Sequence, residues 1–596
     1  MNYIYLITSL FLMYSFYKIE KTKKLQNGFF WVILSVSLFF IFNTFIVNFL
    51  SLVKIKSSPL NLSLINTLIS SILFILQKKK ILNYQKYYYK KRHMVNFAII
   101  IFIILFISIM RFGYDFSNIV FETTDPAAHF TAAAEFSEVQ SVLSKKNTSN
   151  IIYSGFDRMQ NAYYINSGLF MSTFNMVEKY RCFIIFEVIL LMLTSLIFYI
   201  TSVTLLKSDK LSWICLIITF LYLFGYPLNN MLFGFGYLGF SIFTFSLIIC
   251  LQLLLYRKCD LKIYLPIMFL LNFNLFFSYF LFMPIFYLAQ GLIYIYDFIF
   301  KKTKFIELVK IFSITLLIPF FIGCLYFFVL IVKNEEVTLI ASEGYIYRSL
   351  FSNFVLISPI IFYVGFMEIK KRKINLLNIL FLIIITIIAF LFIIGLNGNI
   401  SSYYFFKFYF PLWTIVWLLV AVSFSYSNKI NVNSLGTIFL MIILLAIGTL
   451  RIESKISSVN ILFNPEYVSS SFLNLYIVNE NYIYTDAVIF NKQELELLEG
   501  IDTVKNECNI NDFLDSNVEL LQSIWMTILI DVLPIYEYTG HGDFYTYEFN
   551  YDDFLQSEER KCFLYFNDSK ELDYFDNDNY SILYENEAGK IYKKAD

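Results

Sequence analysis

The sequence contains little charge. Only 15% of its 596 residues are Asp, Glu, Lys or Arg, whereas 58% are hydrophobic and the mean hydropathy is +0.64. These values exclude an ordinary soluble protein, in which about a quarter of the residues are charged. The chain also lacks the P-loop motif and any repeat of fixed period, so neither a P-loop nucleotide site nor a repeat architecture is predicted.

Cysteine is scarce and shows no metal-binding pattern. None of the seven cysteines belongs to a C-x-x-C pair, and five lie in or beside apolar segments, where cysteine behaves as a small apolar residue. The sequence therefore predicts no cysteine-based metal cluster. Cys508 and Cys562 lie in the C-terminal region, where they can form a disulfide in an oxidising compartment or stay unpaired.

Long apolar runs fill the first 450 residues. We count about fourteen runs of roughly 17 to 25 residues, each long enough to cross about 30 Å of hydrocarbon as a helix that rises about 1.5 Å per residue. The first run is not a cleaved signal peptide, because its basic cluster follows the apolar residues and no small-residue cleavage site is present. The pattern predicts a polytopic α-helical membrane protein with about fourteen transmembrane helices.

The basic connections between these runs alternate along the chain. They fall on one side of the predicted membrane, at residues 18–24, 78–92, 207–210, 257–262, 301–304 and 370–373. The positive-inside rule makes that side cytoplasmic and places the N-terminus and everything after residue 450 outside a plasma membrane. The connection KKKILNYQKYYYKKRH at residues 78–93 resembles a nucleic-acid patch, but beside a bilayer it predicts contact with anionic membrane lipids and not with nucleic acid.

The charge of the chain changes sign near residue 450. The segment 451–596 carries about 28 acidic and about 10 basic residues, whereas the remainder has a net charge of roughly +19. Short β-rich runs in this segment, at residues 475–478, 482–484, 562–566 and 582–584, alternate with helical stretches at 492–498 and 518–530. They predict a small, acidic, extracytoplasmic α/β domain.

We divide the chain into three parts on this basis. Residues 1–94 hold N-terminal transmembrane helices and a basic cytoplasmic loop. Residues 95–450 form a transmembrane core with a long outer loop at 112–181, and residues 451–596 form the acidic domain. A membrane connection of about 70 residues is unusual, and loops of that length are generally functional.

The long outer loop contains the sequence FETTDPAAHFTAAAEF at residues 121–136. Its Asp-Pro step is a strong helix start, and it predicts a helix over residues 127–143 that lies along the membrane surface. Asp125 and His129 would then lie one turn apart on the same face, with Glu122 just upstream. Ionisable side chains at a bilayer surface usually face a substrate or water, so chemistry is predicted here.

Two interpretations of these side chains are open. Asp125 can be only a helix cap, and His129 a structural hydrogen-bonding residue. Alternatively, a carboxylate removes the proton from a hydroxyl group of an acceptor. A helix N-terminus lowers the pKa of a carboxylate and weakens it as a base, so Glu122 would take the proton while Asp125 positions the acceptor or a divalent cation such as Mg²⁺ or Mn²⁺.

The arrangement resembles the GT-C superfamily of integral membrane glycosyltransferases, which carry an acidic motif in a long outer loop, many spans and often a soluble C-terminal domain. The resemblance rests on Glu122, Asp125, Pro126 and His129, with weaker similarities in residues 225–239 (GYPLNNMLFGFGYLG), 278–284 (SYFLFMP) and 403–413 (YYFFKFYFPLW). Two features depart from the family pattern. Three spans precede the helix that leads into the loop, and the acids are spaced E-x-x-D instead of standing adjacent or as D-x-D.

The resemblance implies a bacterial plasma-membrane enzyme. Such an enzyme transfers a sugar from a polyprenyl-phosphate donor to a cell-surface polymer or a lipid-linked glycan on the outer face, usually with inversion at the anomeric carbon. Asp125, Glu122 and His129 would be the catalytic residues. The departing phosphate requires nearby cations, for which Lys407, Arg348 and Arg158 are candidates.

Each of these binding residues also has a plainer explanation. Lys407 and Arg348 are suitably placed to be interface anchors, and Arg158 can pair with its neighbour Asp157, which is itself a candidate substrate ligand. The sugar hydroxyl groups would meet three residues at predicted outer ends of spans, namely Asn229, Asn230 and Tyr279. Asn and Tyr are also common at membrane interfaces without any ligand.

Other functions remain in consideration. A polysaccharide polymerase or ligase also joins lipid-linked sugars outside the membrane. A flippase or transporter of lipid-linked glycans would be expected to carry ionisable groups near mid-membrane and some internal symmetry. Glu187 is the nearest to an embedded acid, about four residues from the outer boundary of its predicted span.

Overall fold

The computed structural model describes residues 3–18, 28–79, 90–121, 125–143, 160–172, 174–206, 211–300, 303–332, 363–367, 370, 376–396, 407–427, 482–483, 488–504, 506–507, 520–530, 562–566 and 580–594. These residues form mainly helices. Eight helices are long and apolar enough to cross a membrane, or nine if one bent pair counts as a single span. The prediction of a helical membrane protein is therefore confirmed, while the count of about fourteen stays a prediction because parts of the apolar sequence lie outside the described residues.

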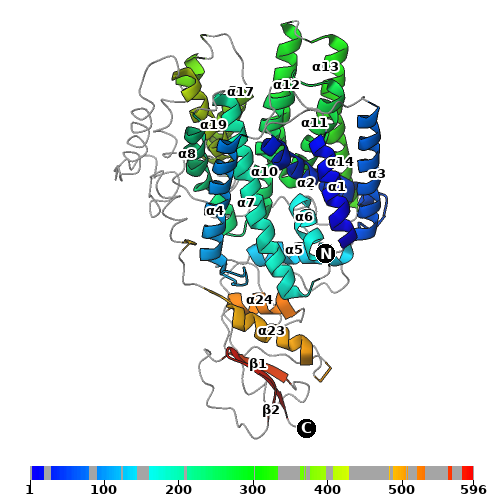
Figure 1. The fold of residues 1–596 in the computed structure, drawn as a ribbon, viewed down its shortest axis with the longest axis vertical. Helices are drawn as coiled ribbons and strands as arrows, with labels where there is room; N and C mark the ends of the chain where they lie inside the picture. Colours follow the sequence, from blue (N-terminus) through cyan, green and yellow to red (C-terminus); the bar gives the residue numbers. More distant parts are fainter. Residues whose placement is uncertain are drawn as a thin grey trace, which may run out of the picture.

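The spanning helices come mostly from the first 330 residues (Figure 1). They are α2 (Gly28–Leu52), α3 (Pro59–Lys78), α4 (Lys91–Phe112), α7 (Met176–Leu206), α10 (Gly236–Leu255), α11 (Leu261–Ser278), the turn η2 (Phe280–Phe282) with α12 (Met283–Ile299), and α13 (Phe305–Phe312), which continues through η3 (Ser313–Leu317) into α14 (Ile318–Val332). Three further apolar helices are α1 (Tyr3–Lys18), α17 (Leu376–Leu396) and α19 (Tyr409–Ser427).

One apolar segment is broken. Helix α8 (Ser212–Leu223) and helix α9 (Tyr226–Leu232) are bent by 43° at a short break. The break contains Gly225, where a Cβ atom would collide with the Trp413 ring of α19. Pro227 follows in the first turn of α9, a position that tolerates its missing backbone N–H group. The break therefore requires glycine at this position, because the indole leaves no room for a side chain.

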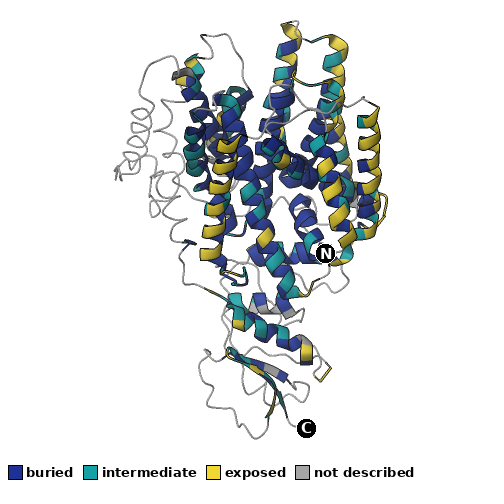
Figure 2. Ribbon diagram, in the orientation of Figure 1, coloured by how far each residue is buried: buried dark blue, intermediate teal, exposed yellow. Residues whose placement is uncertain are grey.

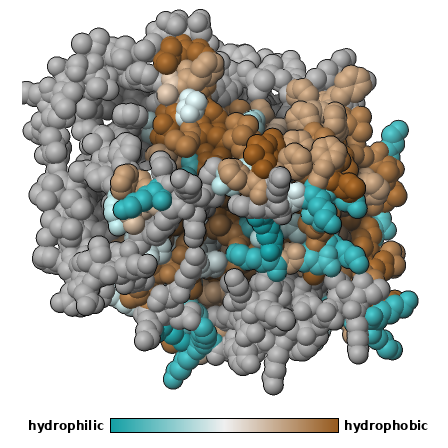
Figure 3. Space-filling view, turned by 90° about the horizontal axis from the view of Figure 1, so that it is seen from above, coloured by the Kyte–Doolittle hydropathy of each residue, from teal (hydrophilic) through white to brown (hydrophobic). Residues whose placement is uncertain are grey.

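Helices α7 and α10 form the centre of the bundle. In their most apolar windows, 83% of the α7 residues and 89% of the α10 residues are buried, against 22% for α3 (Figure 2). Large apolar side chains on α3, α4, α12 and α13 are exposed, as expected for faces that contact lipid tails. Seen from the end opposite α5, hydrophobic side chains reach the rim of the bundle while hydrophilic side chains gather in patches (Figure 3).

Two short helices pack at one end of the bundle. These are α5 (Asp125–Val139) and α6 (Ala162–Met171), and the N-terminus and the C-terminal elements lie at the same end (Figure 1). Asparagine pairs join α6 to α2. Asn161 donates to Asn48 Oδ1 at 2.8 Å and Asn48 donates to Asn161 Oδ1 at 3.0 Å, while Asn166 donates to Thr44 at 3.0 Å. Such interhelical hydrogen bonds are worth about 0.6 kcal/mol each on average in membrane proteins.

The C-terminal segment combines helices with a small sheet. Helix α23 (Lys492–Val504) and helix α24 (Leu520–Ile530) precede the strands β1 (Cys562–Phe566), β2 (Tyr580–Asn586) and β3 (Gly589–Lys594), which pair antiparallel in the order β1-β3-β2. The predicted β-rich runs at 562–566 and 582–584 lie in strands, whereas residues 482–483 are helical and 475–478 lie outside the described residues. Helix α23 contacts β2 and β3, so these elements form one small α/β unit.

Cys562 in β1 is disulfide-bonded. Its predicted partner, Cys508, lies outside the described residues. Five cysteines carry free thiols, namely Cys182, Cys215, Cys250, Cys259 and Cys324. These five lie in the helical bundle or its connections, as their apolar surroundings in the sequence predict.

Candidate functional site

Helix α5 begins at Asp125 as the Asp-Pro step predicts, and it ends at Val139. Gly168 of α6 allows close packing against α5, because a Cβ atom at this position would lie only 2.6 Å from the backbone oxygen of Ala133. Nine of its fifteen residues are buried, from Pro126 to Ser137, because α6, α7 and α24 pack against the helix. That the helix lies along the membrane surface stays a prediction.

The start of α5 packs against a turn between α9 and α10. Gly234 in this turn has φ +71°, and a Cβ atom there would lie 2.5 Å from Pro126 Cγ. Only glycine adopts this backbone conformation readily and also leaves room for the proline ring. The turn therefore fixes where Asp125 stands.

Residues 234–239, GFGYLG, have the glycine spacing of the dinucleotide-binding fingerprint. That fingerprint requires a preceding strand, whereas these glycines follow the helix α9 and open the helix α10. Gly234 and Gly236 have local packing roles instead. Gly236, for example, leaves no room for a Cβ atom between Glu187 and the Tyr163 ring. The spacing therefore does not indicate a nucleotide site.

His129 lies one turn into α5 and is held by two tyrosines. Its Nδ1 atom is hydrogen-bonded to the Tyr164 hydroxyl at 2.8 Å, and its ring centroid lies 4.7 Å from that of Tyr237. Burial, helped by the nearby Lys407 ammonium, lowers the pKa of His129 to about 3. The imidazole is therefore neutral at physiological pH and can act as a hydrogen-bond partner rather than as a cation.

Lys407 reaches the same place from a distant part of the chain. It stands two residues before α19, is 1% exposed and donates a hydrogen bond from Nζ to the Tyr237 hydroxyl at 3.2 Å. Three aromatic rings, those of Phe235, Tyr237 and Phe410, have centroids 5.5–5.9 Å from Nζ, a separation at which cation–π attraction operates. Burial lowers the pKa of Lys407 to about 7, while the Asp125 carboxylate opposes this shift.

Asp125 is accessible to solvent but closely surrounded by protein atoms. Burial raises the pKa of its carboxyl group above the ordinary value, and the positive charge of Lys407 opposes this shift. The sequence-based expectation of a lowered pKa at a helix N-terminus is thus reversed. Loss of hydration outweighs the helix dipole, so Asp125 is a better proton acceptor than its position in the helix alone predicts.

These side chains form one cluster at the α5 end of the bundle. It contains an acid, Asp125, a partly protonated amine, Lys407, and the neutral imidazole of His129. Its walls are aromatic, because Tyr237 contacts both His129 and Lys407 and its ring lies 6.0 Å from that of Tyr279. The cluster combines a proton acceptor, a cation and flat hydrophobic surfaces that carry hydroxyl groups.

The structure brings four of the predicted site residues together, namely Asp125, His129, Lys407 and Tyr279. Asn229 and Asn230 are buried in α9, and Asn230 lines a separate cavity in the bundle. Four further candidates lie outside the described residues: Glu122, Asp157, Arg158 and Arg348. Among the described residues, no group of three or more His, Cys, Asp or Glu side chains could hold a metal ion.

Sequence reasoning missed Tyr164 and Tyr237. Both touch His129, but a chain with 45 tyrosines offers no local signal that separates these two from the rest. No protein-family model matches the chain, and a search of curated proteins finds no similar sequence. The chemistry of the cluster must therefore be argued from its own geometry and charge.

Proposed function

We propose that the protein is a membrane glycosyltransferase that takes a sugar from a polyprenyl-phosphate donor and transfers it to a hydroxyl group of a glycan. The observation that carries this proposal is the electrostatic proximity of Asp125 to Lys407. These residues are far apart in the chain, and their charges influence each other across one aromatic-walled site. Transfer of a sugar from a phosphate needs both a proton acceptor and a cation.

In the proposed reaction, Asp125 and Lys407 act on the two groups that exchange the sugar. The acceptor hydroxyl oxygen forms a bond to the anomeric carbon as the bond from that carbon to the phosphate oxygen breaks. The proton of the hydroxyl group goes to the Asp125 carboxylate, and the phosphate leaves with the electron pair of the broken bond. Lys407 in its protonated form stabilises the charge that grows on this phosphate.

The remaining residues of the cluster position these two groups. His129 stays neutral, so it does not compete with Lys407 for the phosphate, and its bond to Tyr164 holds its ring in place. Tyr237 and Tyr279 offer ring faces to the donor. A divalent cation at Asp125 would need further ligands, and the predicted second carboxylate, Glu122, lies outside the described residues.

The proposal includes a membrane orientation. We infer that the α5 end faces outward from a bacterial plasma membrane, together with the N-terminus and the acidic C-terminal domain, in a GT-C-like core of about fourteen spans. The basic connections of the sequence support this assignment. A polyprenyl-phosphate donor would then reach Lys407 from the outer leaflet.

A second candidate function is transport of a lipid-linked glycan. It is favoured by the bend between α8 and α9 and by Glu187, a 2%-exposed acid within the spanning helix α7. Broken helices and embedded acids occur at transport sites. The two functions differ in what Asp125 must do, since a transporter does not need a proton acceptor there.

The test uses Asp125→Asn and Lys407→Met, with Asp115→Asn as a matched control. Asp115 lies near the same end, where it accepts from Ser117 at 2.7 Å, but the cluster does not include it. Membranes that contain each variant are incubated with radiolabelled polyprenyl-phosphate hexoses and pentoses, and labelled glycan is measured. We expect losses of about 10²–10⁴-fold for Asp125→Asn and about 10²–10³-fold for Lys407→Met, with the control unchanged.

Full transfer by a normally expressed Asp125→Asn protein would refute the proposal that the protein is a glycosyltransferase. Movement of a labelled lipid-linked glycan into vesicles, unaffected by Asp125→Asn, would support the transporter instead.

A further inference from the structure

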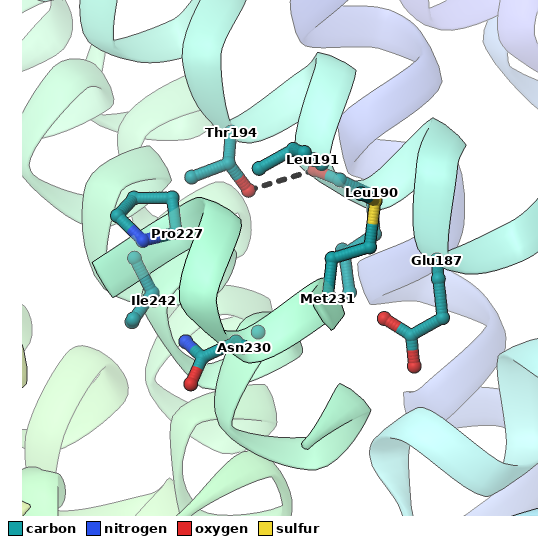
Figure 4. A pocket seen from close by; sticks show the side chains of 9 residues that line it. Glu187, Leu190, Leu191, Thr194, Pro227, Asn230, Met231 and Ile242 are labelled. Atoms are coloured by element: carbon teal, nitrogen blue, oxygen red, sulfur yellow. Dashed lines mark hydrogen bonds between the residues drawn. The ribbon is translucent and has the colours of Figure 1, made fainter. Parts of the chain in front are cut away.

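A small cavity lies inside the bundle between α7, α9 and α10 (Figure 4). Most of its wall is apolar, formed by Leu, Ile, Met and Pro side chains. Three polar side chains also line it: Glu187 and Thr194 from α7 and Asn230 from α9. It has room for about one water-sized group.

Asn230 is the unusual member of this wall. The residue is 1% exposed, and neither its Oδ1 nor its Nδ2 atom has a hydrogen-bond partner among the described residues. Buried amides almost always have partners, because an unpaired donor or acceptor loses its hydration without compensation. Thr194, by contrast, is satisfied, since its hydroxyl donates to the Leu190 carbonyl at 2.8 Å.

Glu187 supplies the second polar group. It is 2% exposed, and its Oε1 atom accepts a hydrogen bond from the Tyr163 hydroxyl. Gly236 makes this contact possible, because any side chain there would collide with both partners. The carboxyl group is therefore fixed in position on the cavity wall.

The chemistry of the wall selects the charge of its occupant. A full charge in this largely apolar cavity would lose most of its hydration, and one amide and one carboxyl group would not compensate that loss. An apolar group would leave both amide atoms of Asn230 unpaired. A neutral hydroxyl group can donate to Oδ1 and accept from Nδ2, and its size matches the cavity.

The cavity is close to the cluster of the proposed transferase. Gly236 borders Glu187, and the next residue, Tyr237, accepts the hydrogen bond from Lys407. On the other side, the Tyr163 ring lies 5.5 Å from that of Tyr164, which binds His129. The cavity and the cluster are thus adjacent, and the Gly236–Tyr237 step and the Tyr163–Tyr164 pair reach from one to the other.

We propose that this cavity is a binding site for one neutral hydroxyl group, held by Asn230 on a wall that it shares with Glu187. The hydroxyl group belongs either to an ordered water molecule or to the sugar of a bound donor, and the second source rests on the proposed transferase function.

The first experiment is electron cryomicroscopy of the full-length wild-type protein in lipid nanodiscs, at a resolution that shows ordered water. If water fills the cavity, we expect a compact density feature about 2.7–3.2 Å from an amide atom of Asn230 without any added donor. If a hydroxyl group of the donor sugar fills it, we expect this feature only after a polyprenyl-phosphate hexose is added. A cavity with no feature in either state, or an Asn230 amide bonded to protein groups, would overturn the proposal.

The second experiment distinguishes the sources without a structure. Transfer is compared for polyprenyl-phosphate hexoses that differ in a single hydroxyl group, in the wild type and in Asn230→Leu. If a sugar hydroxyl enters the cavity, the wild type prefers the complete sugar in kcat/KM by at least about tenfold, and Asn230→Leu loses that preference while still transferring. If water fills the cavity, the preference is the same in both proteins.

A protein without transferase activity would fail only the second experiment. The density test of the cavity stands independently of the proposed function.

Discussion

Replacing Trp525 with alanine should loosen helix α5. Trp525 lies in α24, is 0% exposed and packs against three rings around the start of the site. Its ring centroid lies 5.5 Å from that of Tyr180, 5.9 Å from that of Phe130 and 6.2 Å from that of Phe121. Phe130 follows His129 directly in α5, so the C-terminal segment supports the site through this indole.

The expected magnitude follows from packing alone. Truncating a buried tryptophan to alanine costs about 3–5 kcal/mol, and the Trp525 Nε1 atom has no hydrogen-bond partner among the described residues that would add to the loss. A cost of this size shifts the docking equilibrium of α24 on α5 by about 10²–10⁴-fold. Trp525→Phe keeps a ring in the same place and should recover most of the docking.

Hydrogen–deuterium exchange on the purified protein provides the assay. We expect peptides from residues 125–139 to exchange faster in Trp525→Ala, by up to the same 10²–10⁴-fold, and much less so in Trp525→Phe. Trp213→Ala, in the half-buried first turn of α8, serves as the control for loss of a tryptophan elsewhere. If residues 520–530 exchange freely in Trp525→Ala while residues 125–139 remain as protected as in the wild type, the supporting role of Trp525 is refuted.

Two further predictions concern charge and space in the site. Transfer should show a bell-shaped pH dependence in kcat/KM, because Lys407 loses its proton above about pH 7 and Asp125 gains one as the pH falls through its raised pKa. Initial rates between pH 5 and 9 measure this dependence. A rate that does not fall on the alkaline side would refute the role of Lys407, and so would a Lys407→Arg variant whose alkaline fall stays at the same pH as in the wild type. Gly236→Ala should destabilise the protein by about 1–3 kcal/mol, because the new methyl group collides with Glu187 and Tyr163. A melting temperature equal to that of the wild type in the same detergent would show that the bundle tolerates the methyl group.

The elements that local sequence determines could be predicted. The apolar runs gave the spanning helices, and the Asp-Pro step gave the start of α5 at Asp125. Hydrophobic length and helix-start chemistry act within a few residues, so they can be recognised without knowledge of the fold. The same holds for the strands β1 and β2, whose short runs of aromatic and aliphatic residues indicated β structure in advance.

The partners of the site residues could not be predicted, because tertiary packing decides them. Lys407 was a candidate because of its predicted position at the outer end of a span, yet its contact with Tyr237 joins residues 170 positions apart. The pKa of Asp125 shows the same limit. The helix dipole is a local effect and predicted a lowered pKa, whereas the burial that raises it depends on residues from other helices.

The asparagine pairs between α2 and α6 give the N-terminal helices a part in the chemistry. Helix α6 is only 10 residues long, too short to anchor itself in a bilayer, yet it carries Tyr163 and Tyr164. Hydrogen bonds with the Asn48 amide and the Thr44 hydroxyl fix the position of α6 along the bundle. They thereby fix the positions of both tyrosine hydroxyls relative to His129. The first fifty residues thus hold one wall of the site in position. A chain trimmed to begin at α4 would keep Asp125 and Lys407 but would lose the fixed distance between them and the two tyrosines of α6.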